Sequence, residues 1–359
     1  MSRIDAALIA FLITAAVILA LRPVAFTIGF VDRPGGRKGH VGIVPVTGGI
    51  CMYLGLASTL PLLATPLQGQ GAFLVAGGLL VMIGALDDRF DIPPSVRLVA
   101  QATAALIVCL GAGLVAENLG NILFFGDIHL GVLGLPFTVL VIISVINAFN
   151  MMDGLDGLAG GIGLGALAAA TFAAVAFGDG AGASLGFIGL AVILSFLLFN
   201  FPTPYNRKVR TFMGDAGSTL LGFMVAWMGL KLAHGPSPAI SPVTALWIAA
   251  LPIFDLFISF GRRIAKGQNP LHPDSEHFHH ILARAGFSIR QVAVIMTTVA
   301  FVVGMTGVLA HHAGVPDGML FFGLILIGAV QVWVVRRAWK IASWIRRHRG
   351  QDGVERVGG

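Results

Sequence analysis

The chain has 359 residues, of which 56% are hydrophobic and only 11% are charged, with a formal net charge of +6 and a mean hydropathy of +0.88. Soluble globular domains carry about 25% charged residues, so this composition excludes a soluble enzyme and indicates an integral membrane protein. We expect a lipid bilayer as its surroundings and no nucleic acid as a partner.

Eleven apolar runs follow one another along the chain, and most approach the length of about twenty residues that a membrane-spanning helix requires. They lack the alternation typical of barrel strands, so the sequence predicts an all-α polytopic membrane protein with about eleven transmembrane helices. The first run has little positive charge before it, and we interpret it as a retained span. Cys51 and Cys109 lie inside apolar runs, so no disulfide is expected. The runs cover residues 4–21, 46–64, 72–86, 96–116, 133–149, 158–177, 183–201, 217–233, 242–261, 291–311 and 318–335.

Lysine and arginine are distributed unevenly among the segments that connect these runs. Of the 23 basic residues, 21 lie in alternate segments, and only Arg3 and Lys231 fall elsewhere. Because positive segments stay in the cytoplasm, the N-terminus is predicted to lie outside and the C-terminus inside. These cytoplasmic segments are 22–45, 87–97, 202–216, 262–290 and the residues from 336 onward.

Two features lie outside the predicted spans. On the outer side, residues near 121–132 predict a small β-hairpin, with strands 121–125 and 128–132 joined by Gly126 and Asp127. After a single transmembrane domain at 1–335, residues 336–359 form a basic tail, and its segment 336–349 predicts a helix lying on anionic lipid.

The segment that joins the fifth and sixth runs is rich in polar side chains. Asn147, Asn150, Asp153 and Asp156 recur every three residues, which places them near one another on a helical turn. Such oxygen ligands suit Mg²⁺ and a polyphosphate, and carboxylates are costly at a membrane boundary unless they have a task. The alternative is a polar hairpin between two spans, with glycines for the turn.

Two further acidic motifs occur at the ends of runs on the same side. The adjacent carboxylates of Asp87 and Asp88 repel each other, which favours proton uptake by one of them and could make a base; the alternative is a solvated helix end. Asp215, in the sequence Phe212 to Asp215, could complete a Mg²⁺ site or belong to an ordinary helix start. Phe212 could stack on a base or simply pack.

The cytoplasmic segments also carry histidines and basic residues. Residues 277–280, His-Phe-His-His, lack the further ligands of a zinc site, so contact with phosphate or sugar is favoured over a solvated loop. Lys38 and His40 lie in the first cytoplasmic segment. Basic residues at this place could contact a phosphate, or they could be there only because cytoplasmic segments are generally positive. Asp255 lies in the ninth run, about two turns before Arg262, and the sequence assigns it no task.

The acidic residues separate two classes of function. Most of them map to the cytoplasmic ends of runs, which is typical of an enzyme working on a cytosolic substrate at the lipid boundary. A secondary transporter would carry its acids near the middle of the membrane, in matching halves of the chain. No internal repeat is visible, so the enzyme is favoured.

These motifs, in this order over nearly the whole chain, resemble those of the polyprenyl-phosphate N-acetylhexosamine-1-phosphate transferases. The relative that uses a MurNAc-pentapeptide nucleotide typically carries Thr-Pro-Thr-Met-Gly-Gly and three consecutive histidines. The corresponding residues here are 44–49, Val-Pro-Val-Thr-Gly-Gly, and 277–280. Together with Arg262 and Arg263, these departures favour the bacterial undecaprenyl-phosphate GlcNAc-1-phosphate transferase branch, although donors with a 6-deoxy-HexNAc sugar stay open.

The resemblance implies transfer of GlcNAc-1-phosphate from UDP-GlcNAc to undecaprenyl phosphate, with release of UMP, at the start of lipid-linked glycan synthesis such as O-antigen or cell-wall polymer. It implies a multi-pass protein of the bacterial inner membrane, with a Mg²⁺-dependent active site in cytoplasmic loops, where Mn²⁺ could substitute. Residues 1–335 would then form one catalytic domain. The sequence does not exclude a homodimer.

The resemblance also implies roles for individual residues. Asp215 would bind Mg²⁺ with help from Asn150, and Asp87 would act as the base. Asp88 would hold the metal or position the lipid phosphate, while Asp153 and Asp156 would place the uridine end of the donor. Substrate binding would involve Lys38, His40, Asn147, Asn150, Phe212, Arg262, Arg263, His277, His279 and His280.

Overall fold

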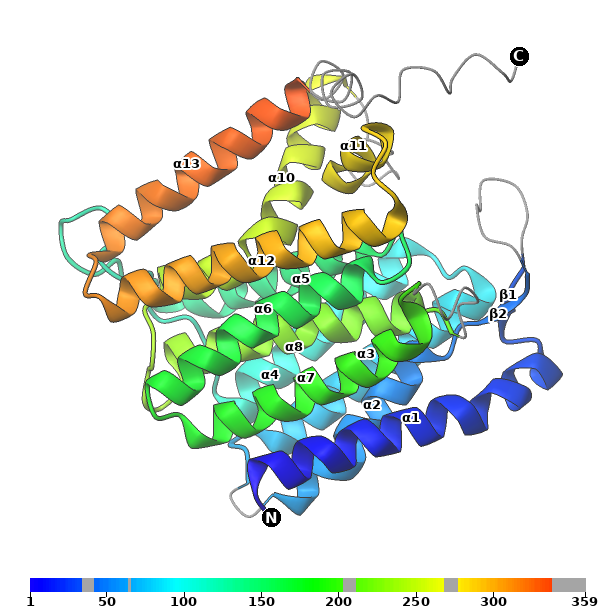
Figure 1. Ribbon diagram of the computed structural model, residues 1–359. Coiled ribbons are helices and arrows are strands. Elements are labelled where there is room, and N and C mark those ends of the chain that lie inside the picture. Colours follow the sequence, from blue (N-terminus) through cyan, green and yellow to red (C-terminus); the bar gives the residue numbers. More distant parts are fainter. Residues whose placement is uncertain (34–41, 64–65, 203–210, 268–276, 338–359) are drawn as a thin grey trace.

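The computed structural model describes residues 1–33, 42–63, 66–202, 211–267 and 277–337, and this part of the chain is predominantly helical (Figure 1). Its elements are α1 (Arg3–Ile28), β1 (Val31–Asp32), β2 (Val44–Pro45), α2 (Gly48–Thr59), the 3₁₀ helix η1 (Leu60–Leu62), α3 (Gln70–Phe90), α4 (Pro94–Ala112), the 3₁₀ helix η2 (Gly131–Leu133), α5 (Gly134–Met152), α6 (Leu158–Ala176), α7 (Gly180–Asn200), α8 (Gly214–His234), α9 (Pro242–Ile248), α10 (Ala250–Ala265), α11 (Phe278–Arg284), α12 (Ile289–His312) and α13 (Asp317–Arg336).

The predicted all-α class is confirmed, because each of the eleven apolar runs coincides with one helix or with two consecutive helices. Nine of the described helices are long and apolar enough to cross a membrane. The helices α9 and α10 would together make a tenth span, although an 81° bend separates them. The second run, which forms α2 and η1, is a shorter apolar helix. Length and composition therefore support nine or ten spans where the sequence predicts eleven.

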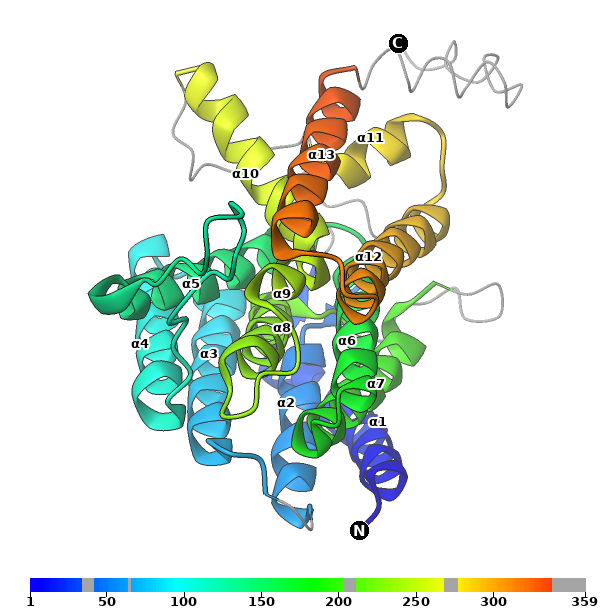
Figure 2. The same ribbon diagram turned by 90° about the vertical axis from the view of Figure 1, so that its left-hand side faces the viewer.

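Helix α8 lies at the centre of the bundle, with α3, α4 and α5 on one side and α1, α6 and α7 on the other (Figure 2). In its apolar window 94% of the residues are buried, against 22% in α1 and in α13. A helix that is apolar on every face is stable only when other helices surround it. Small residues allow close approach: a Cβ at Gly49 of α2 would lie 2.2 Å from the backbone nitrogen of Gly217.

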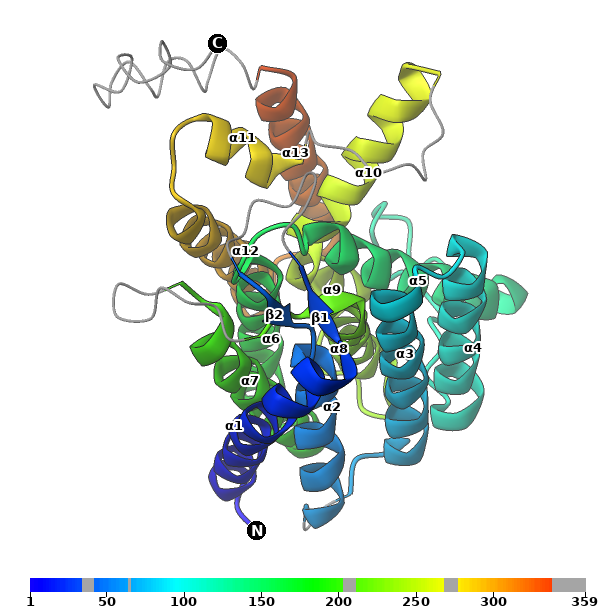
Figure 3. The ribbon, with the colours of Figure 1, turned by 90° about the vertical axis from the view of Figure 1, so that its right-hand side faces the viewer.

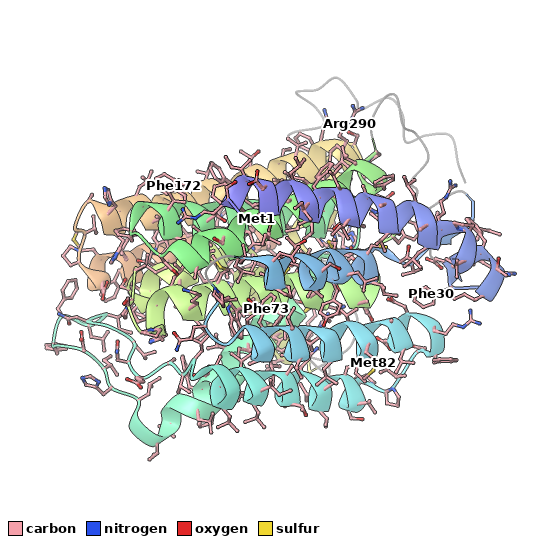
Figure 4. All side chains as sticks on the ribbon, turned by 90° about the horizontal axis from the view of Figure 1, so that it is seen from below. Met1, Phe30, Phe73, Met82, Phe172 and Arg290 are labelled. Atoms are coloured by element: carbon pink, nitrogen blue, oxygen red, sulfur yellow. The ribbon has the colours of Figure 1, made fainter. Side chains whose placement is uncertain are left out.

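The outer helices expose large apolar side chains, including Leu8 and Leu12 of α1 and Leu326 of α13. In a membrane protein such side chains contact lipid, so their exposure agrees with the predicted spans. Figure 4 shows Phe30 and Arg290 toward one end of the bundle. Residues of two predicted cytoplasmic segments, 22–45 and 262–290, therefore lie toward the same end.

The last helices form a separate layer at one side of the bundle, where α10 rises beside α11 and α13 (Figures 1 and 2). A small apolar cluster joins α9, α10 and α13, and Trp247 Nε1 donates a hydrogen bond to the carbonyl of Leu320 at 3.1 Å. The 81° bend after α9 directs α10 out of the bundle. The basic tail from residue 338 onward lies outside the described residues, so its predicted helix stays a prediction, as does the division at 335.

The predicted outer hairpin needs a correction in its strands. The backbone pairs residues 117–120 with 128–130, with a single bridge between Asn118 and His129, and residues 121–126 form the turn. The side chain of Asn121 accepts a hydrogen bond from the backbone of Gly126 at 3.0 Å. Because such side-chain bonds satisfy the backbone locally, they replace the strand predicted at 121–125. The two-stranded sheet of the described chain lies elsewhere, where β1 and β2 pair antiparallel.

We expect Gly49→Ala to destabilise the protein, because the added methyl group would overlap the backbone of α8 at Gly217 and Ala216. Overpacking of this kind costs about 1–3 kcal/mol, which for a chain of 359 residues corresponds to a fall in melting temperature of about 1–4 °C. Gly71→Ala is the matched control, since a Cβ there meets nothing within 4 Å. Thermal unfolding of both variants in detergent, followed by tryptophan fluorescence, measures the difference; equal melting temperatures would contradict the packing described here.

Candidate active site

Several of the predicted motif residues meet at one end of α8. Asp87 and Asp88 lie in the last turn of α3, and Asn150 lies in the last turn of α5. Asp215 lies in the first turn of α8. In Figure 3 this end of the bundle faces the viewer, with β1 and β2 in front of α2 and α8. Residues up to 128 positions apart in the sequence are thereby brought into hydrogen-bonding contact.

Asp88 holds the start of α8. Its Oδ1 accepts a hydrogen bond from the backbone nitrogen of Asp215 at 2.8 Å, and its Oδ2 accepts from that of Ala216 at 3.4 Å. A carboxylate is favourable there, because the first N–H groups of a helix have no partner within the helix. Gly214 is required at this contact: its φ is +68°, and an added Cβ would lie 2.3 Å from Oδ2 of Asp88. Gly214 therefore allows the contact with Asp88 that sets the position of the Asp215 backbone, from which the Asp215 side chain extends.

Arg97, near the start of α4, links two of the carboxylates. Its Nη1 donates to Oδ2 of Asp87 at 2.6 Å and to Oδ2 of Asp215 at 3.2 Å. The other oxygen of Asp87 accepts from the backbone nitrogen of Ile92 at 2.9 Å. The side chain of Asp87 is 4% exposed and that of Arg97 is 35% exposed. The guanidinium therefore partly faces solvent while it offsets two buried or half-buried charges.

Two asparagines of α5 attach this helix to its neighbours. Asn150 Nδ2 donates to Oδ1 of Asp215 at 2.7 Å and to Oγ of Ser218 at 3.0 Å. Asn147 Nδ2 donates to Oε1 of Gln101 at 2.6 Å. A cavity of about 20 Å³, large enough for one water-sized group, opens between these residues and Arg97. The asparagine motif thus lines a small polar space beside Asp215.

Asp153 and Asp156 lie in the loop between α5 and α6, and both are half-buried. Burial raises the pKa of Asp153 well above its usual value of 3.8, and the charges of Asp215, Asp88 and Asp156 raise it further. Carboxylates that repel one another in this way favour a bound cation, which would offset their charge. The loop therefore extends the negative charge of the site beyond Asp215.

The segment at Phe212 lies against the first cytoplasmic segment. The backbone nitrogen of Phe212 donates to the carbonyl of Pro45 at 2.8 Å, and its carbonyl accepts from Gly48 at 2.9 Å. The hydroxyls of Thr47 and Thr211 are 3.1 Å apart and hydrogen-bonded. The half-buried Phe212 side chain is thereby held next to Asp215 in the chain. Lys38 and His40 lie outside the described residues, so their predicted contacts stay predictions.

The histidine motif reaches the same site from α11. Both ring nitrogens of His279 are buried and have no hydrogen-bond partner within the described part of the chain. A Cβ added to Gly154 would lie 2.9 Å from Nε2 of His279, so the ring rests on the loop that carries Asp153. Burial lowers the pKa of His279 to about 3, helped by the charges of His280 and His277, so the ring is neutral at pH 7.

The remaining predicted binding residues lie farther along α10. Arg262 and Arg263 occupy its last turn, where Arg262 is half-buried and Arg263 is buried. Both take part in interactions within the protein. The described contacts place neither side chain beside Asp215, so their predicted contact with substrate stays a prediction.

Sequence reasoning missed Arg97 and Gln101, which contact predicted site residues directly. Both stand in the first half of an apolar run, and Arg97 entered the sequence argument only as one of 21 basic residues. Their spacing of four residues at the start of α4 is the signal that could have identified them, since it places them on one helical face. Only the packing of α4 against α3 and α5 shows that this face lines the site.

The side chains around Asp215 offer ligands of the kind that Mg²⁺ prefers. Asp215 and Asn150 offer hard oxygen atoms, and each carboxylate oxygen retains a second lone pair besides the one used for Asn150 or Arg97. Mg²⁺ is usually held by one or two carboxylates plus substrate phosphates. Among the described residues, no group of three His, Cys, Asp or Glu side chains has a metal-binding arrangement. The residues present therefore fit a Mg²⁺ ion that shares its coordination with a diphosphate.

We expect Asp153→Asn to stabilise the metal-free protein increasingly as the pH rises. The folded-state pKa of Asp153 lies above 3.8, so the folded state binds a proton more tightly than the unfolded chain. Stability is therefore lost as the pH rises from about 3.8 towards the folded-state pKa, and the neutral amide avoids that loss. Melting temperatures in EDTA between pH 5 and pH 8 measure the gap between variant and parent.

Asp127→Asn is the control for this experiment, because Asp127 is an exposed acid of the outer loop. Its melting temperature should follow that of the parent at every pH. If the difference in melting temperature between Asp153→Asn and the parent is the same at pH 5 and pH 8, the raised pKa of Asp153 does not explain the effect of the variant.

Comparisons with known proteins identify the family of the chain. The family model described as glycosyl transferase family 4 matches residues 71–233. A protein of Escherichia coli (strain K12) is 38% identical over 343 residues, which cover 94% of this chain and 92% of the relative. A protein of Haemophilus influenzae is 38% identical and covers 92% of this chain and 93% of its own. Both are named undecaprenyl-phosphate alpha-N-acetylglucosaminyl 1-phosphate transferase. The chain therefore belongs to this transferase family.

Proposed function

We propose that this protein transfers GlcNAc-1-phosphate from UDP-GlcNAc to undecaprenyl phosphate and releases UMP. The observation that carries the proposal is the meeting of Asp87, Asp88 and Asp215 with Arg97 and Asn150 at one helix end. Carboxylates, amides and one guanidinium are the groups that a phosphate-transfer site with a metal requires. The names of relatives that align with 94% of the chain support the same reaction.

A cytoplasmic active site at the inner membrane is part of this proposal. The site lies where α3 ends and α8 begins, at residues of the predicted segments 87–97 and 202–216. The positive-inside rule places those segments in the cytoplasm, where a nucleotide sugar is available. The same rule places Lys231 and the N-terminus on the outer side.

In the proposed reaction, an oxygen of the lipid phosphate attacks the β-phosphorus of UDP-GlcNAc. The bond from that phosphorus to the oxygen bridging it to the α-phosphate breaks, so UMP leaves and undecaprenyl-diphospho-GlcNAc forms. Both substrates are anionic, and Arg97 supplies a positive charge at the point where they must approach. Mg²⁺ held by Asp215 and Asn150, or Mn²⁺ in its place, would stabilise the negative charge that develops on the phosphate oxygens.

The two adjacent acids of α3 have different tasks in this proposal. Asp88 positions Asp215, since both of its oxygens accept hydrogen bonds from the start of α8. Asp87 holds Arg97 at 2.6 Å before substrate binds and accepts the proton of the lipid phosphate once the guanidinium moves to that phosphate. Charge is conserved at both groups in this exchange. Asp87 loses contact with the guanidinium and gains a proton, while the phosphate loses that proton and gains contact with the guanidinium.

The donor nucleotide and its sugar would occupy the edges of the site. Phe212 would stack on the uracil, with Asp153 and Asp156 placing the uridine end. His279 suits a sugar or phosphate contact, because its two buried nitrogens offer one donor and one acceptor in the neutral ring. His277, His280, Lys38, His40, Arg262 and Arg263 complete the proposed binding set.

A lipid substrate also needs an apolar path. An apolar cavity of about 370 Å³ lies beside α5, α8 and α9, with Val145, Val225 and Leu246 among its lining residues. On α8 the cavity is lined from Val225 to His234, toward the end opposite to Asp215, and on α5 it reaches Val145, five residues before Asn150. The isoprenoid chain of undecaprenyl phosphate would use such apolar surface, since each buried CH₂ group contributes about 0.8 kcal/mol.

We expect purified protein in detergent to release UMP when given undecaprenyl phosphate, Mg²⁺ and UDP-GlcNAc. A panel that adds UDP-GalNAc, a UDP-6-deoxy-HexNAc and UDP-MurNAc-pentapeptide identifies the donor, and UDP-GlcNAc should give the highest kcat/KM. Exhaustive EDTA treatment should stop turnover, and Mn²⁺ should restore it. Asp215→Asn should abolish turnover and also remove the electron paramagnetic resonance signal of bound Mn²⁺.

Three outcomes would overturn parts of this assignment. Release of UMP from none of the donors would reject the transferase activity. Full turnover after EDTA treatment, or Mn²⁺ binding that survives in Asp215→Asn, would reject the metal role of Asp215.

Asp87→Asn should lower kcat by at least about 100-fold while the KM for UDP-GlcNAc changes little, because the amide keeps the shape but takes up no proton. The loss should persist from pH 6 to pH 9. Steady-state kinetics at several pH values measure the loss of kcat. Asp127→Asn is the control, because Asp127 is an exposed acid in the outer loop. Lipid phosphomonoesters lose their second proton near pH 6. Rescue of Asp87→Asn at high pH would therefore show that the dianion attacks unaided, and a collapse in nucleotide binding would place Asp87 in the metal–diphosphate site.

A further inference from the structure

Asp255 is a buried carboxylate that the proposed reaction does not use. It lies in α10, shortly after the 81° bend, and its side chain is 3% exposed. A charge so far from water persists only when partners satisfy it. Two partners of Asp255, His277 and Phe278, lie within the longest predicted cytoplasmic segment, 262–290.

Its two oxygens attach α11 to α10. Oδ2 lies 2.7 Å from Nδ1 of His277, and Oδ1 accepts a hydrogen bond from the backbone nitrogen of Phe278 at 3.0 Å. His277 is the N-cap residue of α11 but provides no side-chain cap of its own. Asp255 therefore satisfies the first N–H of α11 from a different helix.

The same contact determines the tautomer of His277. A carboxylate accepts hydrogen bonds and donates none, so the proton of the neutral ring is on Nδ1. The lone pair is then on Nε2, which becomes the nitrogen able to accept a hydrogen bond or a proton. Carboxylate partners fix imidazole tautomers in this way in many enzymes.

The ring of His277 is stacked on that of His279 in the same motif. The two rings are parallel, with centroids 5.7 Å apart and an interplanar angle of 4°. The ring of His280 follows, 4.2 Å from that of His279. Because His279 rests on Gly154, a chain of direct contacts connects Asp255 with the loop between Asp153 and Asp156.

We propose that Asp255 is a positioning residue for the transfer reaction: it holds α11 against α10 and fixes the tautomer of His277, so that the stacked histidines face the loop of Asp153 and Asp156. Asp255 touches no substrate in this proposal. It acts through His277, and the inference rests on the proposed transferase activity.

A double-mutant cycle tests the proposal in full-length protein purified in detergent, with the donor that the unmodified protein uses best. In Asp255→Asn the amide keeps its shape, but its NH₂ group must face one of the two partners: at Nδ1 of His277 it favours the opposite tautomer, and at Phe278 it leaves the backbone N–H without its acceptor. His277→Gln retains a donor for Asp255 but removes the ring. Each variant should lower kcat by at least about 10-fold, and the double variant should be no worse than His277→Gln alone, because without the ring Asp255 has no tautomer left to fix.

Asp179→Asn is the matched control. Asp179 also caps a helix, accepting from Gly182 at 2.9 Å, and it pairs with Lys231 at 2.5 Å on the predicted outer side. Its loss should lower the melting temperature while kcat stays within about twofold. Equal losses of kcat in Asp179→Asn and Asp255→Asn would reduce the role of Asp255 to stability and overturn the proposal.

The remaining outcomes are also decisive. Multiplicative losses in the double variant would show that Asp255 does not act through His277. If Asp255→Asn fails to fold, His277→Gln carries the test, because it can keep α11 docked: unchanged kcat in that variant would refute a role for the fixed ring. Asp255→Glu, which keeps the charge, should retain more activity than Asp255→Asn. An inactive unmodified protein would instead reject the transferase activity itself.

Discussion

The contact between the Asp88 carboxylate and the first N–H groups of α8 is the interaction on which the site depends. It joins the end of α3 to the start of the most buried helix, and it is possible because Gly214 has no side chain in its way. Once α8 is fixed at this end, Asp215 has only a small space in which its carboxylate can lie. Asn150, Ser218 and Arg97 then surround that space, so the geometry of the site follows from how one helix begins.

The site concentrates negative charge where a stable protein would avoid it. Asp87, Asp88, Asp153 and Asp215 lie close together, and Arg97 is the cation that contacts two of them directly. The raised pKa of Asp153 shows that repulsion and burial are not fully offset. Such strain is expected where binding a cation or a diphosphate restores the balance, and proteins commonly give up stability for function at such places. The small polar cavity beside Asp215 lies where that balance would be restored.

The histidine motif is attached to this centre by contacts of a different kind. The helices α10 and α11 stand outside the main bundle, and Asp255 joins them through one side-chain contact and one backbone hydrogen bond. The ring of His279 then reaches the loop at Gly154. The main bundle and the loop after α5 therefore carry the carboxylates of the site, whereas a smaller unit carries the histidines. The bend after α9 is what places that unit beside the site.

The sequence by itself determined the membrane class, the helical runs and the acidic motifs, because hydropathy over about twenty residues and polar residues at run ends are local signals. It missed the roles of Arg97, Gln101 and Asp255, and it misplaced the strands of the outer hairpin. Arg97 looked like an ordinary topology charge, and Asp255 like an isolated acid in an apolar run. Their partners lie 10 to 118 residues away in the chain, so only the packing of α4 on α3, and of α11 on α10, could show them. The tertiary structure decided these roles because a hydrogen bond depends on distance in space, which residue spacing specifies only within a single helix or turn.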